Sequence, residues 1–150
     1  MMIEGVIIKR LDRFPDERGT VSHMLKYTDK EFIKFGEIYF SSVHPNAIKA
    51  WHLHKKMILN YVCISGNIKL VLCDDRSDSP TYRKIQEIFI GEDDYCLVQI
   101  PNGVYNGFKA VGDRTAIVAN CSTLPYDPKE ITRLPFNTGH IDYNWEIKNG

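Results

Sequence analysis

The sequence predicts an all-β protein that folds as a barrel or sandwich in a single domain. Short runs rich in Val, Ile, Tyr and Phe recur along the chain, and Gly, Pro, Asp and Asn residues separate them. The chain has 150 residues, an ordinary length for one domain with its own core. Its hydrophobic content of 43% and aromatic content of 11% are typical of a globular protein rather than a disordered one.

Seven runs are the clearest strand candidates, and turn residues lie between them. They are Gly36 to Val43, Met57 to Ile64, Ile68 to Cys73, Ile85 to Ile90, Tyr95 to Ile100, Tyr105 to Val111 and Thr115 to Cys121. Several strands at such short spacing favour a sandwich or barrel. Between the second and third runs, Ser65-Gly66-Asn67 predicts a hairpin turn in which Gly66 takes a positive φ.

Two further segments complete the expected fold. Thr28 to Phe35 is the one segment expected to be helical, with Asp29 as its cap and with Phe32 and Phe35 on one side. The segment from Tyr126 to Gly150 contains several Pro and Gly turns. We expect it to wrap the barrel rather than to form a separate unit.

Charge, hydropathy and cysteine content argue against several classes of protein, among them nucleic-acid-binding, membrane, secreted and zinc-binding proteins. Lys plus Arg and Asp plus Glu are 19 each, so nothing in the balance indicates a nucleic-acid or anionic-membrane partner. No stretch approaches 18 apolar residues and the first residues do not resemble a secretion signal, so we expect a cytoplasmic protein. The four cysteines lie in apolar runs without a C-x-x-C pair, which predicts packed thiols rather than disulfides or a zinc site.

The segment Trp51-His52-Leu53-His54 carries the strongest chemical signal. Residues two apart in a strand point to the same face, so both imidazoles would enter the barrel interior together. A base with a pKa near neutrality is useful in such a concave site. Two imidazoles alone rarely hold a divalent ion, so we expect acid–base work and no metal. Alternatively, one of the two histidines is only a hydrogen-bonded interior residue. This structural explanation fits His54 better than His52.

Cations near this segment suit a phosphate-bearing ligand. Lys49 lies three residues before His52, and Arg18 stands next to the turn residue Gly19. Both could bind a diphosphate, which an Arg does bidentately. A solvated surface is the usual explanation for any single cation, and we expect it for Lys55 and Lys56.

Two amides are further candidates for ligand binding. In the strand that follows Pro101-Asn102-Gly103, Asn106 and Phe108 would share one face. Asn106 could then bond a ligand in the barrel, or equally a backbone group. Asn120 is a lone amide in an apolar strand, so it must find a partner either in the protein or in a ligand.

The segments around His52 and Asn106 resemble the two signatures of the cupin superfamily. Metal-binding cupins add a Glu about four residues after the His pair and a further His in the second signature. Here the first position falls on Met57 or Ile58, and the second is Asn106. The resemblance implies a cupin-type β-barrel or jelly roll that has kept its fold without its metal ligands.

The chain also resembles the dTDP-4-dehydrorhamnose 3,5-epimerase family of cupins, through several segments in the right order. They are Asp16-Glu17-Arg18-Gly19, Ile48-Lys49-Ala50-Trp51-His52, Asp75-Arg76 with Ser79-Pro80-Thr81, Ile100-Pro101-Asn102-Gly103 with Asn106-Gly107-Phe108, Tyr126-Asp127-Pro128-Lys129-Glu130 and Asp142-Tyr143-Asn144-Trp145. The resemblance places His52 on the base that removes the proton beside the sugar ketone, and Arg18 and Lys49 at the diphosphate. It implies a nucleotide-diphospho-sugar substrate, no cofactor, a homodimer and a place in surface-polysaccharide biosynthesis.

The chain departs from the family at several functional positions. The family's proton-donating Tyr aligns with Asn120, and its Lys near the ketone oxygen falls at Leu59 or Asn60. The Asp that orients the base falls near Asn137 or Thr138. We therefore expect a 4-keto-6-deoxy nucleotide sugar to be epimerised through an enolate at C3, C5 or both, with the nucleotide base left open.

Two alternatives remain. The run His52-Leu53-His54-Lys55-Lys56 is similar to the His-x-His-Lys-Lys of the dTDP-sugar 3,4-ketoisomerases, and Tyr39 stands roughly where those enzymes place an active-site Tyr. Loss of the family Tyr and Lys would also fit a non-catalytic binder of sugar nucleotides or carbohydrates.

Overall fold

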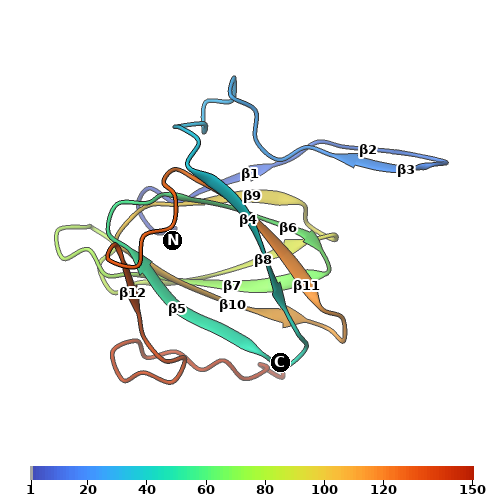
Figure 1. The fold of residues 1–150 in the computed structure, drawn as a ribbon. Coiled ribbons are helices and arrows are strands. Elements are labelled where there is room, and N and C mark those ends of the chain that lie inside the picture. The colour runs from blue at the N-terminus through green and yellow to red at the C-terminus, as the bar shows by residue number, and fades with distance from the viewer. Residues whose placement is uncertain (1) are drawn as a thin grey trace.

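The structure, a computed structural model, describes residues 2–150 and confirms the expected all-β barrel (Figure 1). Residues 2–150 form twelve strands and no α-helix. The strands are β1 (Ile7–Arg10), β2 (Arg13–Asp16), β3 (Gly19–Ser22), β4 (Glu37–Val43), β5 (Ile48–His54), β6 (Leu59–Ser65), β7 (Asn67–Asp74), β8 (Ile85–Gly91), β9 (Cys96–Ile100), β10 (Val104–Val111), β11 (Ala116–Ser122) and β12 (Ile131–Arg133). Within these residues no helix has the length and hydropathy of a membrane-spanning segment.

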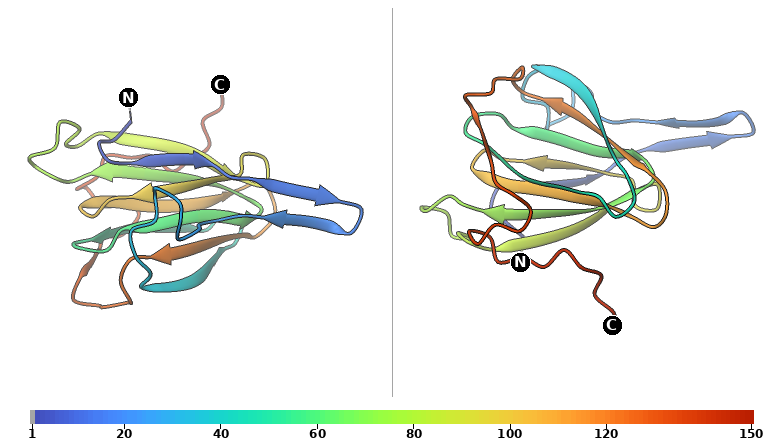
Figure 2. Two further views of the ribbon diagram at one scale, coloured as in Figure 1. Left: turned by 90° about the horizontal axis from the view of Figure 1, so that it is seen from above. Right: turned by 60° about the horizontal axis from the view of Figure 1, so that its bottom comes forward.

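Two antiparallel five-stranded sheets form the barrel (Figures 1 and 2). One has the strand order β1-β9-β6-β11-β4 and the other β12-β5-β10-β7-β8. Apart from β7 and β8, strands that neighbour one another in these two sheets are not consecutive in sequence, as in a jelly roll. The hairpin of β2 and β3 is a separate two-stranded sheet, which projects from the barrel in all three views.

Each of the seven predicted strand runs matches an observed strand, β4 or one of β6 to β11, to within one or two residues at each end. The pattern is clearest in β7, where Ile68, Leu70 and Leu72 face the core between the sheets. Val71 and Cys73 on the opposite face belong to a second buried cluster. Because both faces are covered, this strand is an almost continuous apolar run. The predicted turn is also confirmed, with Gly66 at a φ of 70°.

The expected helix from Thr28 to Phe35 is wrong, since residues 28–31 form turns and residues 32–35 form no regular element. Lys9 of β1 holds it against the barrel, with its Nζ 2.9 Å from Glu31 and 3.2 Å from Asp29. The Gln99 side chain also donates to the Glu31 carbonyl at 2.7 Å. These tertiary contacts engage the groups that a helix would have used for its own cap and ladder.

The C-terminal segment covers the outer face of the β12-β5-β10-β7-β8 sheet, as expected. The Trp145 ring packs 5.1 Å from the ring of Trp51, and Tyr143 meets both edge-on. The Lys69 ammonium lies over the rings of Tyr143 and Trp145. Since Trp51 is buried on this outer side, its neighbours in β5 must point into the barrel.

The segments Asp74-Asp75-Arg76 and Ser79-Pro80-Thr81 form a hydrogen-bonded cluster outside the barrel cavity. The buried carboxylate of Asp74 accepts bonds from Arg76 Nε at 2.8 Å and from the hydroxyls of Ser79 and Thr81, both at 2.6 Å. Burial raises the pKa of Asp74, but these bonds outweigh it and lower that pKa overall. All four cysteines are free, as predicted.

Candidate active site

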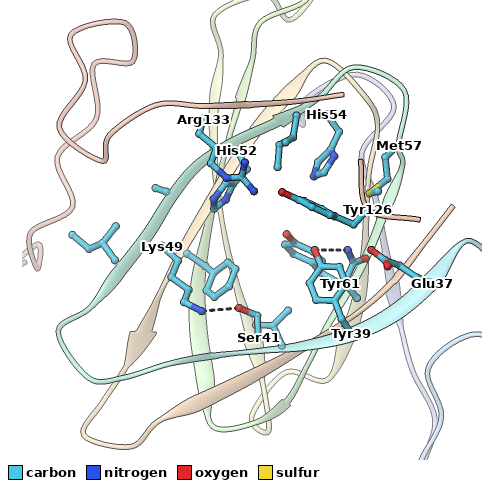
Figure 3. A pocket seen from close by; sticks show the side chains of 16 residues that line it. Glu37, Tyr39, Ser41, Lys49, His52, His54, Met57, Tyr61, Tyr126 and Arg133 are labelled. Carbon is cyan, nitrogen blue, oxygen red and sulfur yellow. Dashed lines mark hydrogen bonds between the residues drawn. The ribbon is translucent and has the colours of Figure 1, made fainter. Parts of the chain in front are cut away.

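A cavity of about 590 Å³ opens between the two sheets (Figure 3). This volume lies in the range of small-molecule sites. Strands from both sheets form its walls, and Met57 and Tyr126, which lie in loops, line it as well. The lining residues are Glu37, Tyr39, Ser41, Ile48, Lys49, Ala50, His52, His54, Met57, Tyr61, Phe108, Val118, Asn120, Tyr126, Ile131 and Arg133.

Strand β5 brings both predicted imidazoles into this cavity. His52 and His54 line it, while Trp51 and Leu53 pack on the outer side of the sheet. Strand β12 pairs with β5 so that Arg133 lies opposite His52 and Ile131 opposite His54. The register therefore places a cation beside one histidine only.

The imidazole of His52 lies among cations. Burial, and then the charges of Arg133, His54 and Lys49, lower its pKa from the usual 6.5 to about 4. In residues 2–150 the structure records no hydrogen bond to this ring, whose surroundings hold it neutral at pH 7. A neutral imidazole keeps one donor and one acceptor nitrogen for a ligand.

His54 has a different environment. Its Nδ1 lies 2.6 Å from Oε1 of Glu130, and both side chains are buried. The other carboxylate oxygen of Glu130 accepts the backbone N–H of Lys55 at 2.9 Å and that of Lys56 at 3.3 Å. The carboxylate is therefore anchored to the end of β5 and fixes the orientation of the His54 ring.

Amides and phenols form hydrogen-bonded pairs at the cavity. Asn120 donates to the Tyr39 hydroxyl at 3.0 Å and accepts the backbone N–H of Asn60 at 3.1 Å. The Tyr61 hydroxyl donates to Asn106 at 3.2 Å, and burial raises the pKa of this phenol well above 10.0. Tyr39, Tyr61 and Asn120 line the cavity and can direct polar groups at a ligand.

Asn106 lies behind the cavity rather than in its wall. Its amide nitrogen donates to the carbonyl of His52 at 2.9 Å, and its oxygen accepts the Tyr61 hydroxyl. Phe108, on the same face of β10, reaches the cavity wall. Protein groups thus use the polar atoms of Asn106, and the residue holds β5 next to His52.

Lys49 and Arg133 place two cations in the cavity wall. The Lys49 Nζ donates to the Ser41 hydroxyl at 2.9 Å, as the dashed line in Figure 3 shows. Such an arrangement can bind an anionic group, because a hydrogen-bonded ammonium and a planar guanidinium both suit phosphate oxygens.

Arg18 is not brought to this cavity within the chain. It lies at the turn of the projecting β2–β3 hairpin, with a side chain that is 86% exposed and paired with Asp16 at 2.6 Å. A sequence motif does not determine the direction in which a hairpin projects from the barrel. That direction depends on the bend of the chain between β1 and β2.

Sequence reasoning missed three side chains that shape the site, namely Tyr126, Glu130 and Arg133. Arg133 lies in the short strand β12, which was not predicted, Glu130 directly precedes this strand, and Tyr126 lies in the loop before it. The alternation of Ile131 and Arg133 is a signal that could have placed them on one face. Within the described chain, no group of three or more His, Cys, Asp or Glu side chains is arranged to hold a metal ion.

Comparisons with known proteins agree with this geometry. The sequence model of a family described as dTDP-4-dehydrorhamnose 3,5-epimerase matches residues 1–149. The chain is 31% identical to the spore coat polysaccharide biosynthesis protein SpsL of Bacillus subtilis, over 98% of this chain and 99% of that protein. It is 33% identical to the probable low-salt glycan biosynthesis epimerase Agl13 of Haloferax volcanii, over 97% and 96% of the two chains.

A solved structure agrees with the fold as well. The crystal structure of a dTDP sugar isomerase from Desulfovibrio desulfuricans G20 superimposes with a TM-score of 0.93. That protein is 40% identical, and the match covers 95% of this chain and 92% of that chain.

Proposed function

The chain belongs to the dTDP-4-dehydrorhamnose 3,5-epimerase family, and we propose that it epimerises a 4-keto-6-deoxy nucleotide-diphospho sugar. One observation carries this proposal: two imidazoles of β5 lie in one cavity together with two cations and several hydroxyl and amide groups. Acid–base groups and anion-binding groups are the two requirements for moving a proton on a sugar that is attached to a diphosphate.

The proposed reaction begins at the carbon next to the ketone, C3 or C5 of the sugar. An imidazole takes the proton, the C–H electron pair moves to the carbonyl oxygen, and an enolate forms. Donors in the cavity wall, Tyr39 and Asn120 among them, stabilise the charge on that oxygen. A proton that returns on the opposite face restores the ketone and inverts the carbon.

We assign the return of the proton to Tyr126. Asn120, which stands where the family has its Tyr, carries an amide that cannot act as a proton donor near neutral pH. Figure 3 shows the Tyr126 hydroxyl pointing into the cavity toward Arg133 and His52.

The binding roles follow from position in the cavity. Lys49 and Arg133 contact the diphosphate, while Tyr39 and Asn120 contact the sugar. Asn106 supports them by holding the backbone of His52.

We also propose that the protein is a homodimer. Phe14 and Val21 of the projecting hairpin are 56% and 62% exposed, and Ile38 and Phe40 of the edge strand β4 are 51% and 63% exposed. A second copy that covers these apolar side chains would remove an exposed strand edge. Arg18 on the hairpin would then reach the phosphates of the second copy. Light scattering should give twice the chain mass, and Phe40→Glu but not Phe89→Glu should reduce it.

The biological setting is part of the proposal. Relatives named for spore coat polysaccharide and glycan biosynthesis support a role in making a sugar for a surface polysaccharide. The four free thiols fit a reducing compartment, so we place the protein in the cytoplasm.

Deuterium exchange tests the proposed function. The protein is incubated in D2O with 4-keto-6-deoxy sugars carried on dTDP, UDP, CDP or GDP, and label is followed by mass spectrometry and NMR. Label at C3 or C5 with inverted configuration is the expected result. A ketone that moves to C3 would identify the 3,4-ketoisomerase instead. Binding without exchange on any of the four would identify a non-catalytic binder.

A further inference from the structure

The cavity holds two imidazoles, and a carboxylate is bonded to only one of them. We propose that Glu130 is a positioning residue that makes His54, rather than His52, the base that removes the substrate proton. This inference rests on the proposed function and assigns the roles within its pair of histidines. It reverses the order that the resemblance implied, in which His52 is the base.

The contacts of Glu130 determine the tautomer of His54. Its Oε2 accepts two backbone N–H groups, so Oε1 is the oxygen that faces the imidazole, and a carboxylate oxygen can only accept hydrogen bonds. The proton in the 2.6 Å contact between Oε1 and His54 must therefore lie on Nδ1. In the neutral ring the other nitrogen, Nε2, then carries the free lone pair.

That lone pair is available to a ligand. Among residues 2–150 the recorded hydrogen bond of the His54 ring is the one at Nδ1, and the ring lines the cavity. Figure 3 shows the ring pointing into the same cavity as the Tyr126 side chain. An oriented base with one nitrogen fixed by a carboxylate is the arrangement that general-base catalysis requires.

Charge separates the two histidines. A base that takes a proton becomes an imidazolium, and at His54 that cation would lie 2.6 Å from the Glu130 carboxylate. At His52 the same cation would form beside Arg133 and Lys49, which already lower the affinity of this ring for protons. Opposite charge favours the product of proton transfer at His54, and like charge opposes it at His52.

The proton balance is complete with residues of this chain. His54 Nε2 takes the proton, the C–H electrons pass to the ketone oxygen, and the Nδ1 proton stays shared with Glu130. His52 remains neutral and can donate a hydrogen bond to the enolate oxygen. The carbon is then protonated from the opposite face, as in the proposed function, so no oxidant or reductant is needed.

Single substitutions distinguish this assignment from a structural role for Glu130. In the D2O assay, His54→Asn should slow exchange by about 10²–10⁴-fold, the usual contribution of a general base. Glu130→Gln, which keeps an acceptor for the Lys55 N–H, should slow it at least about tenfold. The loss should fall on kcat with KM little changed, because the lost contact acts on proton transfer and not on substrate binding. A structural role would lower the free energy of unfolding or raise KM without this selective loss of kcat.

Two further variants complete the comparison. His52→Asn should lose less exchange than His54→Asn. The exposed pair of His140 and Asp75, with Nε2 and Oδ1 2.9 Å apart, is a matched imidazole–carboxylate contact outside the cavity, and His140→Asn should leave exchange unchanged. Exchange that survives His54→Asn and is abolished in His52→Asn overturns the inference but leaves the proposed function intact.

A measurement without substrate keeps the inference testable if the proposed function itself fails. The ¹⁵N shifts of the ligand-free protein should show neutral His54 with its proton on Nδ1, and Glu130→Gln should weaken that preference. A neutral His54 with its proton on Nε2 would overturn the inference whatever the protein acts on.

Discussion

Arg133 lies opposite His52 in the antiparallel pair of β5 and β12, so that a permanent cation stands beside an uncharged imidazole. The pairing explains why the two histidines of one strand differ. Side chains at His52 and His54 share a face, yet the neighbouring strand supplies an Arg to the first and an Ile to the second. The charge beside each histidine is thus determined by the residue opposite it on the neighbouring strand as well as by its own position in β5.

Arg133→Gln should raise the pKa of His52 from about 4 toward 6.5, because the largest charge that disfavours its imidazolium is removed. Burial should keep the value below 6.5. Titration of the His52 ring followed by NMR measures the change. Arg114→Gln, which removes a surface partner of Glu92, is the control and should not alter the titration.

Stability should fall between about pH 6.5 and pH 4 because of His52. The folded pKa is lower than the unfolded one, so in this window the unfolded chain binds more protons and its free energy drops relative to the native state. The contribution is about 1–3 kcal/mol at the acid end. Urea unfolding at a series of pH values should show a shallower loss for His52→Asn, and identical slopes would contradict the lowered pKa.

Lys49→Met should weaken binding of the nucleotide sugar, with KM raised about tenfold and kcat changed less, because a phosphate contact made equally in the ground and transition states is lost. Added salt should narrow the gap between the variant and the parent. Lys30→Met, at a side chain that is 91% exposed, should behave like the parent. Equal KM values for Lys49→Met and the parent would contradict a role for Lys49 in binding the diphosphate.

Tyr126→Phe should separate exchange from inversion. Without the phenol the base can still remove and return a proton on its own face, so deuterium should enter the substrate with retained configuration. Inversion should slow by about 10²-fold or more. NMR of the product distinguishes the two outcomes. If inversion and exchange persist at the parent's rates, another group is the donor.

Activity should not depend on a divalent metal, as the missing Glu and His of the cupin signatures predict. Dialysis against EDTA should leave the rate of exchange unchanged, and metal analysis should show no stoichiometric ion. A rate that falls with EDTA and recovers with one added metal would contradict this prediction. The cavity carries two imidazoles, where catalytic metal sites usually use three protein ligands.

Much of the barrel could be predicted because a strand that buries one or both faces has a recognisable local pattern of apolar residues. β7 and β11 are apolar runs between turn residues, and both were expected within one or two residues of their observed ends. β2 and β3 were not, since all their residues are exposed and no buried face imposes a pattern. The false helix at 28–35 failed for a tertiary reason, the anchoring of Asp29 and Glu31 by Lys9.

The sequence by itself determined that His52 and His54 share one face, because the two-residue period of a strand is a local property of the backbone. It also determined that cations lie near them, since Lys49 is on the same strand. Only the tertiary structure decided which histidine has a carboxylate and which has a guanidinium. Glu130 is 76 residues from His54, and its contact depends on the register of β5 with β12. That register follows from packing over the whole barrel, which no local pattern contains.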